Sequence, residues 1–336
     1  MAWYQLSGKE QDTVISTSVC FERNLTEYPF PARLDAASAH EIIRQVGTVL
    51  EENGFSGTDF TDVSRTMAYS LVEKQYVTPG FVRESIPHAL YLNEPCSLSV
   101  MLCERDHIRL QCLLPGLALR DAFAGACKIE QVLDDRFDLA FDEEIGYLTQ
   151  DPTNAGTAMR ASITLFLPMT VMNGKMDILS ERLGRIGLTI RPVCGEKSGM
   201  DGFLFRVSNR VTLGVTEEAV IDRMQDVVGR ITETERRYRS GVTGSELASL
   251  TDRVLRAEGV LKYAYRMTAG EFLSLSAYVR LGISMGIVKD VCTETLTELT
   301  VDMMPATLSL GTEPAPKNDE ELCVLRAVRV RDRLSV

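Results

Sequence analysis

The residues best suited to chemistry in this sequence are three arginines in or beside strand-like segments. Arg160 follows a polar, glycine-containing loop at residues 152–157. Backbone N–H groups and hydroxyls of such a loop can bind phosphate oxygens, with a guanidinium as the charged partner. Arg109 lies within HIRLQCLLP, and Arg191 lies within LTIRPVCGE, which ends on Glu196. Each pattern alone is more typical of a surface turn or salt bridge. Together they suggest an anion site, although spacing does not show that the arginines converge.

The segments that must position these arginines alternate between helical and strand-like patterns. Residues 36–54 predict an amphipathic helix with Asp35 as its N-cap. Residues 97–115 predict an antiparallel hairpin that turns at Glu104-Arg105-Asp106. Further helices are predicted at 117–135, 174–187 and 217–239, and further strands at 159–168, 188–194 and 203–213. Antiparallel strands mixed with helices favour an α+β domain over a doubly wound parallel sheet.

The pattern changes at SGVTGS (240–245), which we interpret as a boundary between an α+β domain at 1–240 and an all-helical domain at 241–336. The second domain is expected to serve regulation or dimerisation. Its predicted helices are 246–267, 269–288, 293–304 and 318–334. Pro305, Pro314 and Pro316 predict a loop before the last of them.

Bulk composition excludes several classes of protein. The chain has 336 residues and a formal net charge of -11, which argues against nucleic-acid or anionic-lipid binding because both need clustered cations. No apolar run is long enough to span a membrane, and the N-terminus lacks the pattern of a signal peptide, so a cytoplasmic location is expected. The eight cysteines form no CxxC pair, which predicts reduced thiols and no protein-bound metal.

A family resemblance emerges when these motifs are taken together. The sequence resembles the ATP:guanido phosphotransferase family, and within it the bacterial protein-arginine kinases. The resemblance continues beyond the catalytic domain, where creatine-type kinases have nothing equivalent. It rests on WYQLSGKEQDTVISTSVCFERNLTEYPFP (3–31), LVEKQYVTP (71–79), ERDHIRLQCLLPGL (104–117), PTNAGTAMRAS (152–162), IRPVCGE with VSNRVTLG (190–214), RLGISMGIVKD (280–290) and LRAVRVRDRL (325–334).

The resemblance implies an antiparallel-sheet guanido-kinase fold with flanking helices, and transfer of the terminal phosphoryl group of ATP to a protein arginine with Mg²⁺ as cofactor. It implies that Glu196 binds the substrate guanidinium. The residues that it assigns to nucleotide binding are Ser16, Arg109, Arg160, Ala161, Ser162, Arg191 and Gly195.

Five positions depart from the family pattern. Ser18 and Cys20 replace two arginines of the opening Ser-Ser-Arg-hydrophobic-Arg motif, and Arg105 replaces a catalytic carboxylate. Asp151 stands where the family has a reactive cysteine, and Gln75 stands where it has a histidine. Loss of attraction for both the nucleotide and the incoming guanidinium predicts weak catalysis at best.

Arg105 could act as an internal substrate mimic, bound to Asp151 or Glu196, or it could point into solvent at the tip of the hairpin; both readings stay open. In the helical domain, Leu322 and Cys323 match an Arg-Asp pair that helps the family to bind phosphoarginine, which predicts that this sensing is lost.

Two functions follow from the resemblance. The favoured one is a regulatory or scaffold pseudokinase, expected as a homodimer or as the partner of an active paralogue, a zinc-finger adaptor or the Clp protease machinery. The alternative is an active protein-arginine kinase in which Glu196, helped by Glu104 or Asp151, supplies the missing carboxylate. A third function, phosphoarginine binding or dephosphorylation, has no motif of its own.

Overall fold

The computed structural model describes residues 2–95, 97–193 and 202–334, and its centre is an eight-stranded antiparallel sheet. The prediction of an α+β fold with an antiparallel sheet is confirmed, and so is the hairpin at 97–115. In spatial order the strands are β2 (Phe55–Asp59), β3 (Ala89–Asn93), β4 (Leu98–Leu102), β5 (Ile108–Pro115), β1 (Val14–Arg23), β8 (Met159–Phe166), β10 (Leu204–Asn209) and β9 (Leu188–Pro192). A separate two-stranded sheet pairs β6 (Phe141–Asp142) with β7 (Gly146–Tyr147).

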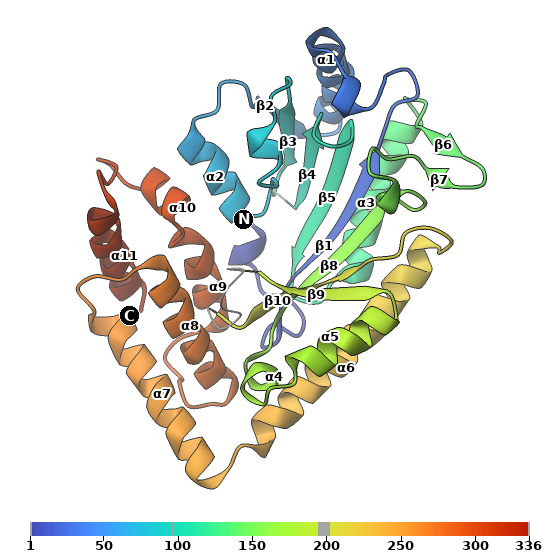
Figure 1. Cartoon of the computed structure of the whole chain (residues 1–336). Helices are drawn as coiled ribbons and strands as arrows, with labels where there is room; N and C mark the ends of the chain where they lie inside the picture. Colours follow the sequence, from blue (N-terminus) through green and yellow to red (C-terminus); the bar gives the residue numbers. More distant parts are fainter. Residues whose placement is uncertain (1, 96, 194–201, 335–336) are drawn as a thin grey trace.

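One face of the large sheet is covered by helices and forms the main hydrophobic core (Figure 1). The helices at this core are α1 (Ala36–Glu52), α3 (Leu119–Asp134), α5 (Met176–Arg185) and α6 (Glu217–Gly241). The predicted N-cap of α1 is confirmed, because the carboxylate of Asp35 accepts a hydrogen bond from the Ser38 N–H at 2.7 Å. The short helix α4 (Pro168–Met172) follows β8.

The opposite face of the sheet looks toward α2 (Arg65–Glu73) and toward the helices that follow residue 241 (Figure 1). These are α7 (Gly244–Tyr263), α8 (Ala269–Ser284), α9 (Thr293–Asp302), α10 (Pro305–Leu310) and α11 (Asp319–Leu334). We call residues 244–334 the helical half; most of its apolar residues form a core of their own. Its division from the rest at 240 stays a prediction. No helix in the described part of the chain is long and apolar enough to cross a membrane.

The prediction of a loop between 305 and 317 is wrong at its start, where α10 forms. Pro305 occupies the first turn of α10, where its missing N–H costs nothing. The carboxylate of Glu73, at the end of α2, accepts hydrogen bonds from the backbone N–H groups of Ala306 (2.9 Å) and Thr307 (2.7 Å). A residue far away in the sequence therefore caps this helix, which a local pattern could not reveal.

Glu73 and Glu294 fix the helical half against the rest of the chain. Glu73 caps α10 as described, and its second oxygen also accepts from the Thr307 hydroxyl at 2.7 Å. Glu294 in α9 accepts from the Ser7 hydroxyl at 2.7 Å and from the Gln11 amide at 2.8 Å. These contacts join both the N-terminal segment and α2 to the helices that follow residue 241.

Glu73→Ala is expected to lower the free energy of unfolding by about 1–2 kcal/mol, because the first turn of α10 loses its acceptor. Chemical denaturation monitored by circular dichroism measures this change. Glu52→Ala is the matched control, since Glu52 is 54% exposed and its pair with Arg136 lies at the surface, so it should change stability by less than about 0.5 kcal/mol. Equal stability of the two variants would contradict the docking role of Glu73.

Candidate functional site

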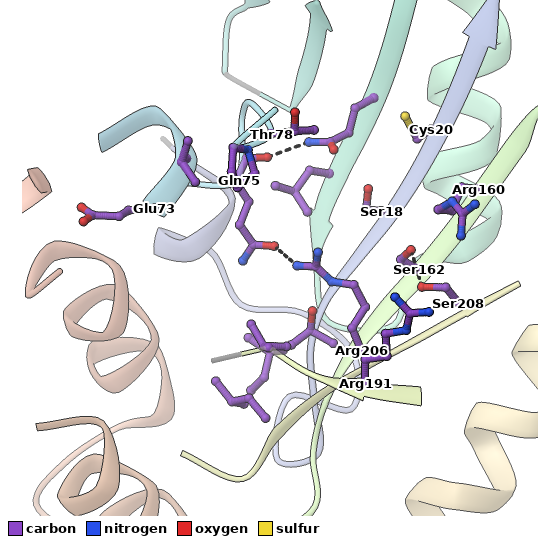
Figure 2. Close-up of a pocket in the computed structure, with 18 of the residues that line it drawn as sticks. Ser18, Cys20, Glu73, Gln75, Thr78, Arg160, Ser162, Arg191, Arg206 and Ser208 are labelled. Atoms are coloured by element: carbon purple, nitrogen blue, oxygen red, sulfur yellow. Dashed lines mark hydrogen bonds between the residues drawn. The ribbon is translucent and has the colours of Figure 1, made fainter. Parts of the chain in front are cut away.

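Strand alternation brings polar side chains together on the sheet face that looks toward the helical half. Side chains of successive strand residues point to opposite faces, so every second residue of each strand joins the same surface. In the observed register Cys20 lies opposite Arg160, and Ser18 lies opposite Ser162. Ser208 lies on the other side of Ser162, and their hydroxyls are 2.8 Å apart (Figure 2). The residues between them, including Val19, Ala161 and Val207, belong to the main core.

These polar side chains line a cavity of about 1250 Å³ between the sheet, α2 and the helical half. Among the described residues its charged lining is strongly cationic. Two glutamates, Glu22 and Glu73, face seven arginines: Arg105, Arg109, Arg160, Arg191, Arg206, Arg210 and Arg280. The structure therefore brings the predicted arginines Arg109, Arg160 and Arg191 to one cavity. In a chain with a net charge of -11, this concentration of cations makes the cavity a candidate site for an anion.

Glu22 organises two of these arginines. One of its carboxylate oxygens accepts from Arg109 Nη1 at 2.7 Å, and the other accepts from the Asn154 amide at 3.0 Å. Asn154 in turn accepts a hydrogen bond from Arg160 Nη2 at 2.9 Å. Burial raises the pKa of Glu22, and the neighbouring guanidinium of Arg109 opposes that rise. The polar loop predicted before Arg160 thus contributes an amide that orients this arginine.

Glu104 lies beside Thr78 and Arg109, two residues that line the cavity. It is buried, and it accepts a hydrogen bond from the Thr78 hydroxyl. Its second oxygen lies 3.9 Å from Arg109 Nε. Burial alone would lower the pKa of Arg109, but the neighbouring carboxylates of Glu104 and Glu22 raise it, so this guanidinium stays charged. Glu104 therefore stabilises the charge of Arg109, and it is poorly placed to bind a second guanidinium.

Ser18 and Cys20 contribute small uncharged side chains to the part of the cavity that β1 forms. Both side chains line the cavity between the flanking arginines (Figure 2). Burial raises the pKa of the Cys20 thiol to about 11, so it is a neutral thiol at physiological pH. The two family arginines that the resemblance expects at these positions are therefore replaced by small neutral groups.

Arg206 and Arg210 line the cavity although the sequence analysis did not identify them. Arg206 lies beside Arg191 in the register of β10 and β9, and its Nη2 donates to the side-chain oxygen of Gln75 at 2.7 Å (Figure 2). The Gln75 carbonyl also accepts from the Gln111 amide at 2.7 Å. The alternation of FRVSNR was the available signal, because it places Arg206, Ser208 and Arg210 on one face. Gln75 thus positions a cavity arginine.

Arg105 lines the cavity, and Asp151 lies near Arg105 but is not among the described lining residues. Arg105 is exposed and is part of the lining, and its charge lowers the pKa of Asp151. The main cause of that lowering is Thr153, whose hydroxyl and backbone N–H donate to Asp151 at 2.7 and 3.0 Å. An ion pair within 4.0 Å between Arg105 and Asp151 does not occur in the described structure. The substrate-mimic hypothesis is therefore not supported at Asp151, and its other partner, Glu196, lies outside the described residues.

The remaining predicted site residues divide into three groups. Ser162 lines the cavity. Ser16 and Ala161 do not line it: Ser16 lies opposite the cavity residue Thr164 but is itself buried, and Ala161 belongs to the main core, with its N–H donating to Asn209 at 2.8 Å. Gly195 lies outside the described residues, as Glu196 does.

Comparison with known proteins gives matches over the whole chain. The family model for the ATP:guanido phosphotransferase C-terminal catalytic domain matches residues 39–238, and the model for the protein-arginine kinase McsB C-terminal domain matches residues 247–336. Protein-arginine kinase from Desulforamulus reducens is 35% identical over 99% of this chain and 95% of its own length. The enzyme of that name from Brevibacillus brevis is 36% identical over 99% of this chain and 95% of its own length.

Solved structures share the fold at lower identity. A duplicated taurocyamine kinase from Schistosoma mansoni superposes with a TM-score of 0.63 and 22% identity, covering 80% of this chain and 40% of that chain. This chain thus spans less than half of the duplicated protein. A lombricine kinase superposes with a TM-score of 0.61 and 18% identity, covering 72% of this chain and 71% of that chain. At these identities the likeness concerns the fold alone.

Arg160→Met is expected to weaken the binding of inorganic pyrophosphate by about 10- to 100-fold, because a charged hydrogen bond contributes about 1.5–3 kcal/mol. Isothermal titration calorimetry at fixed ionic strength measures the affinity. Arg185→Met serves as the control, since Arg185 is 73% exposed on α5 and removes the same charge from the surface. If both variants bound as tightly as the unsubstituted chain, the cavity would not be an anion site that uses Arg160.

Proposed function

Since the chain belongs to the ATP:guanido phosphotransferase family, in its protein-arginine kinase branch, we propose that it is a pseudokinase. It binds the phosphates of a nucleotide in the cationic cavity but transfers a phosphoryl group to protein arginine slowly or not at all. Its role in the cell is then regulatory or structural.

The observation that carries this proposal is the charge of the cavity. The acceptor of the family reaction is itself a cation, and a guanidinium keeps its proton unless carboxylates bind it and help to remove that proton. Among the described lining residues, the two carboxylates are already engaged: Glu22 binds Arg109 and Asn154, and Glu73 caps α10. A substrate guanidinium that enters the cavity is therefore repelled by the seven arginines that line it.

Arg105 adds to this effect at the position where the resemblance expects a catalytic carboxylate. Its guanidinium is exposed at the cavity edge, so an arginine side chain that approaches from solvent meets a like charge first. Asp151 retains a negative charge nearby, and Thr153 donates two hydrogen bonds to one of its two carboxylate oxygens. The same positive charge that repels a guanidinium attracts an anion. The chain can therefore bind a nucleotide without catalysing phosphoryl transfer.

The cavity is suited to the phosphates of ATP or ADP. Arg109 Nε is a buried donor without a hydrogen-bond acceptor in the described structure, and Arg160 and Arg191 lie on the same sheet face. When bound with ATP, Mg²⁺ would neutralise phosphate charge and assist phosphoryl transfer. The arginines of this chain bind and orient the phosphates, and Gln75 positions Arg206 beside them.

The regulatory role implies protein partners. By family resemblance we propose self-association as a homodimer, an active protein-arginine kinase paralogue, or the zinc-finger adaptor and Clp protease machinery, all in the cytoplasm. Half-buried Leu322 and Cys323 in α11 occupy the positions of the family's phosphoarginine-binding pair. Loss of phosphoarginine sensing is part of the same proposal.

The unsubstituted chain is expected to phosphorylate protein arginine about 10²- to 10⁴-fold more slowly than an active relative, because two charged contacts of about 1.5–3 kcal/mol each are missing at Ser18 and Cys20. Arg105→Glu should raise the rate at least about tenfold, since it turns repulsion of the substrate guanidinium into attraction. Transfer of labelled phosphate from ATP to an arginine-containing protein measures both rates.

Arg136→Glu is the matched control for this experiment. It makes the same change of charge at a residue that is 60% exposed on the far side of the sheet, so it should leave the rate unchanged. Turnover by the unsubstituted chain at the rate of an active relative would refute the pseudokinase. It would favour the alternative in which Glu196, with Glu104 or Asp151, serves as the substrate carboxylate.

A further inference from the structure

Among the described residues, Arg280 is the one arginine of the cavity that comes from the helical half. It lies in α8, and its residue surface is only 6% exposed. Nη2 donates to the Thr297 hydroxyl at 2.8 Å, whereas Nη1 is buried without a hydrogen-bond partner in the described structure. A buried guanidinium N–H that finds no acceptor in its own protein carries a substantial desolvation cost.

The charge of Arg280 also lacks a neutralising carboxylate. No acidic side chain of the described residues lies within 4.0 Å of its guanidinium. Burial lowers the pKa of Arg280 to about 10, and Glu294 offsets this only in part, since that carboxylate already accepts from Ser7 and Gln11. At neutral pH the group is therefore a buried cation whose counter-charge must come from elsewhere.

The position of Arg280 joins it to the arginines of the sheet. Its guanidinium carbon lies 5.9 Å from the centre of the Phe166 ring, at the end of β8. Phe166 pairs with Leu204, two residues before Arg206 in β10, and Leu204 also lines the cavity. Arg280 thus stands over the end of the sheet at which Arg206 and Arg191 lie side by side.

The hydroxyls around Arg280 are already used as donors. Thr297 donates to the Thr293 carbonyl at 3.0 Å, Thr300 donates to the Leu296 carbonyl at 2.6 Å, and Ser276 donates to the Leu273 carbonyl at 3.0 Å. Each of these bonds stays within its own helix. Arg280 is therefore the group on this wall best able to donate hydrogen bonds to an anion in the cavity.

We propose that Arg280 forms a second anion subsite, through which the helical half binds one phosphate of a ligand whose other phosphate lies on the sheet arginines. The ligand class is a diphosphate, either free or as part of a nucleotide. This inference deepens the proposed function, since it rests on phosphate binding in the same cavity. It also makes the helical half part of the binding site.

The test compares Arg280→Met with the unsubstituted full-length chain, using ADP, with and without Mg²⁺, and inorganic pyrophosphate as probes in calorimetry at fixed ionic strength. Loss of a charged hydrogen bond should weaken the affinity by about 10- to 100-fold. If the affinity falls for both ADP and pyrophosphate, the subsite accepts a diphosphate from either source. If the affinity falls for ADP alone, the subsite is specific to the nucleotide. Unchanged affinity for both probes would overturn the subsite.

Stability in the absence of ligand separates this role from a structural one. Met retains the apolar packing of Arg280 and removes an uncompensated buried charge, and Thr297 keeps its bond to Thr293, so the melting temperature should be unchanged or higher. A lower melting temperature with unchanged affinity would show that Arg280 only joins helices. Arg280→Lys provides a second variant, which keeps the charge but loses the forked geometry and should bind with intermediate affinity.

Arg256→Met is the control, because Arg256 is 77% exposed on α7 and pairs with Asp252 at the surface. If Arg160→Met loses ADP binding while Arg280→Met retains it, the subsite is refuted and the proposed function stands. If the chain turns over arginine rapidly and Arg280→Met still weakens ADP binding, the subsite stands and the pseudokinase is refuted. If neither probe binds the unsubstituted chain, both are refuted.

Discussion

Several guanidinium groups share one face of the sheet and repel each other, and this repulsion is the constraint that the surrounding residues must satisfy. Like charges in a partly buried space destabilise the folded state unless neighbouring groups or a ligand compensate them. Glu22 and Glu104 compensate Arg109, and the neutral amide of Gln75 orients Arg206 without cancelling its charge. Arg280 donates to the Thr297 hydroxyl but has no acceptor for its Nη1 among the described residues. The cavity is therefore only partly neutralised by its own walls, a state that favours a polyanionic ligand.

Much of the fold could be predicted from the sequence because its elements carry local signals. The apolar spacing and the cap at Asp35 defined α1, and the turn between two β-rich runs defined the hairpin of β4 and β5. The edge strand β2 contains glycine and exposed polar residues, so its sequence lacks the apolar alternation of a strand. Helix α10 depends on Glu73, which belongs to another part of the chain. Such elements are fixed by tertiary contacts, and a local pattern cannot reveal them.

The candidate site could be predicted where the alternation of side chains along a strand determines which residues face the cavity. Arg109 and Arg160 were identified, and the same rule applied to β10 would have added Arg206. Ser16 follows the same alternation and lies opposite the cavity residue Thr164, but it is buried and does not line the cavity. Arg280 could not be found in this way, because only packing of the helical half against the sheet brings it to the cavity. The family resemblance suggested a role for each of these positions, and the structure shows which residues lie beside each one.

The central position of β1 has a consequence for how the protein is made. It precedes the other strands of this sheet in the sequence, yet it lies between β5 and β8, whose last residues are Pro115 and Phe166. A growing chain must therefore keep β1 unpaired, with its apolar side chains exposed, until these partners have been synthesised. Stalled or truncated translation products that end before β8 would present an open strand edge, which is a surface prone to aggregation and a natural target for chaperones.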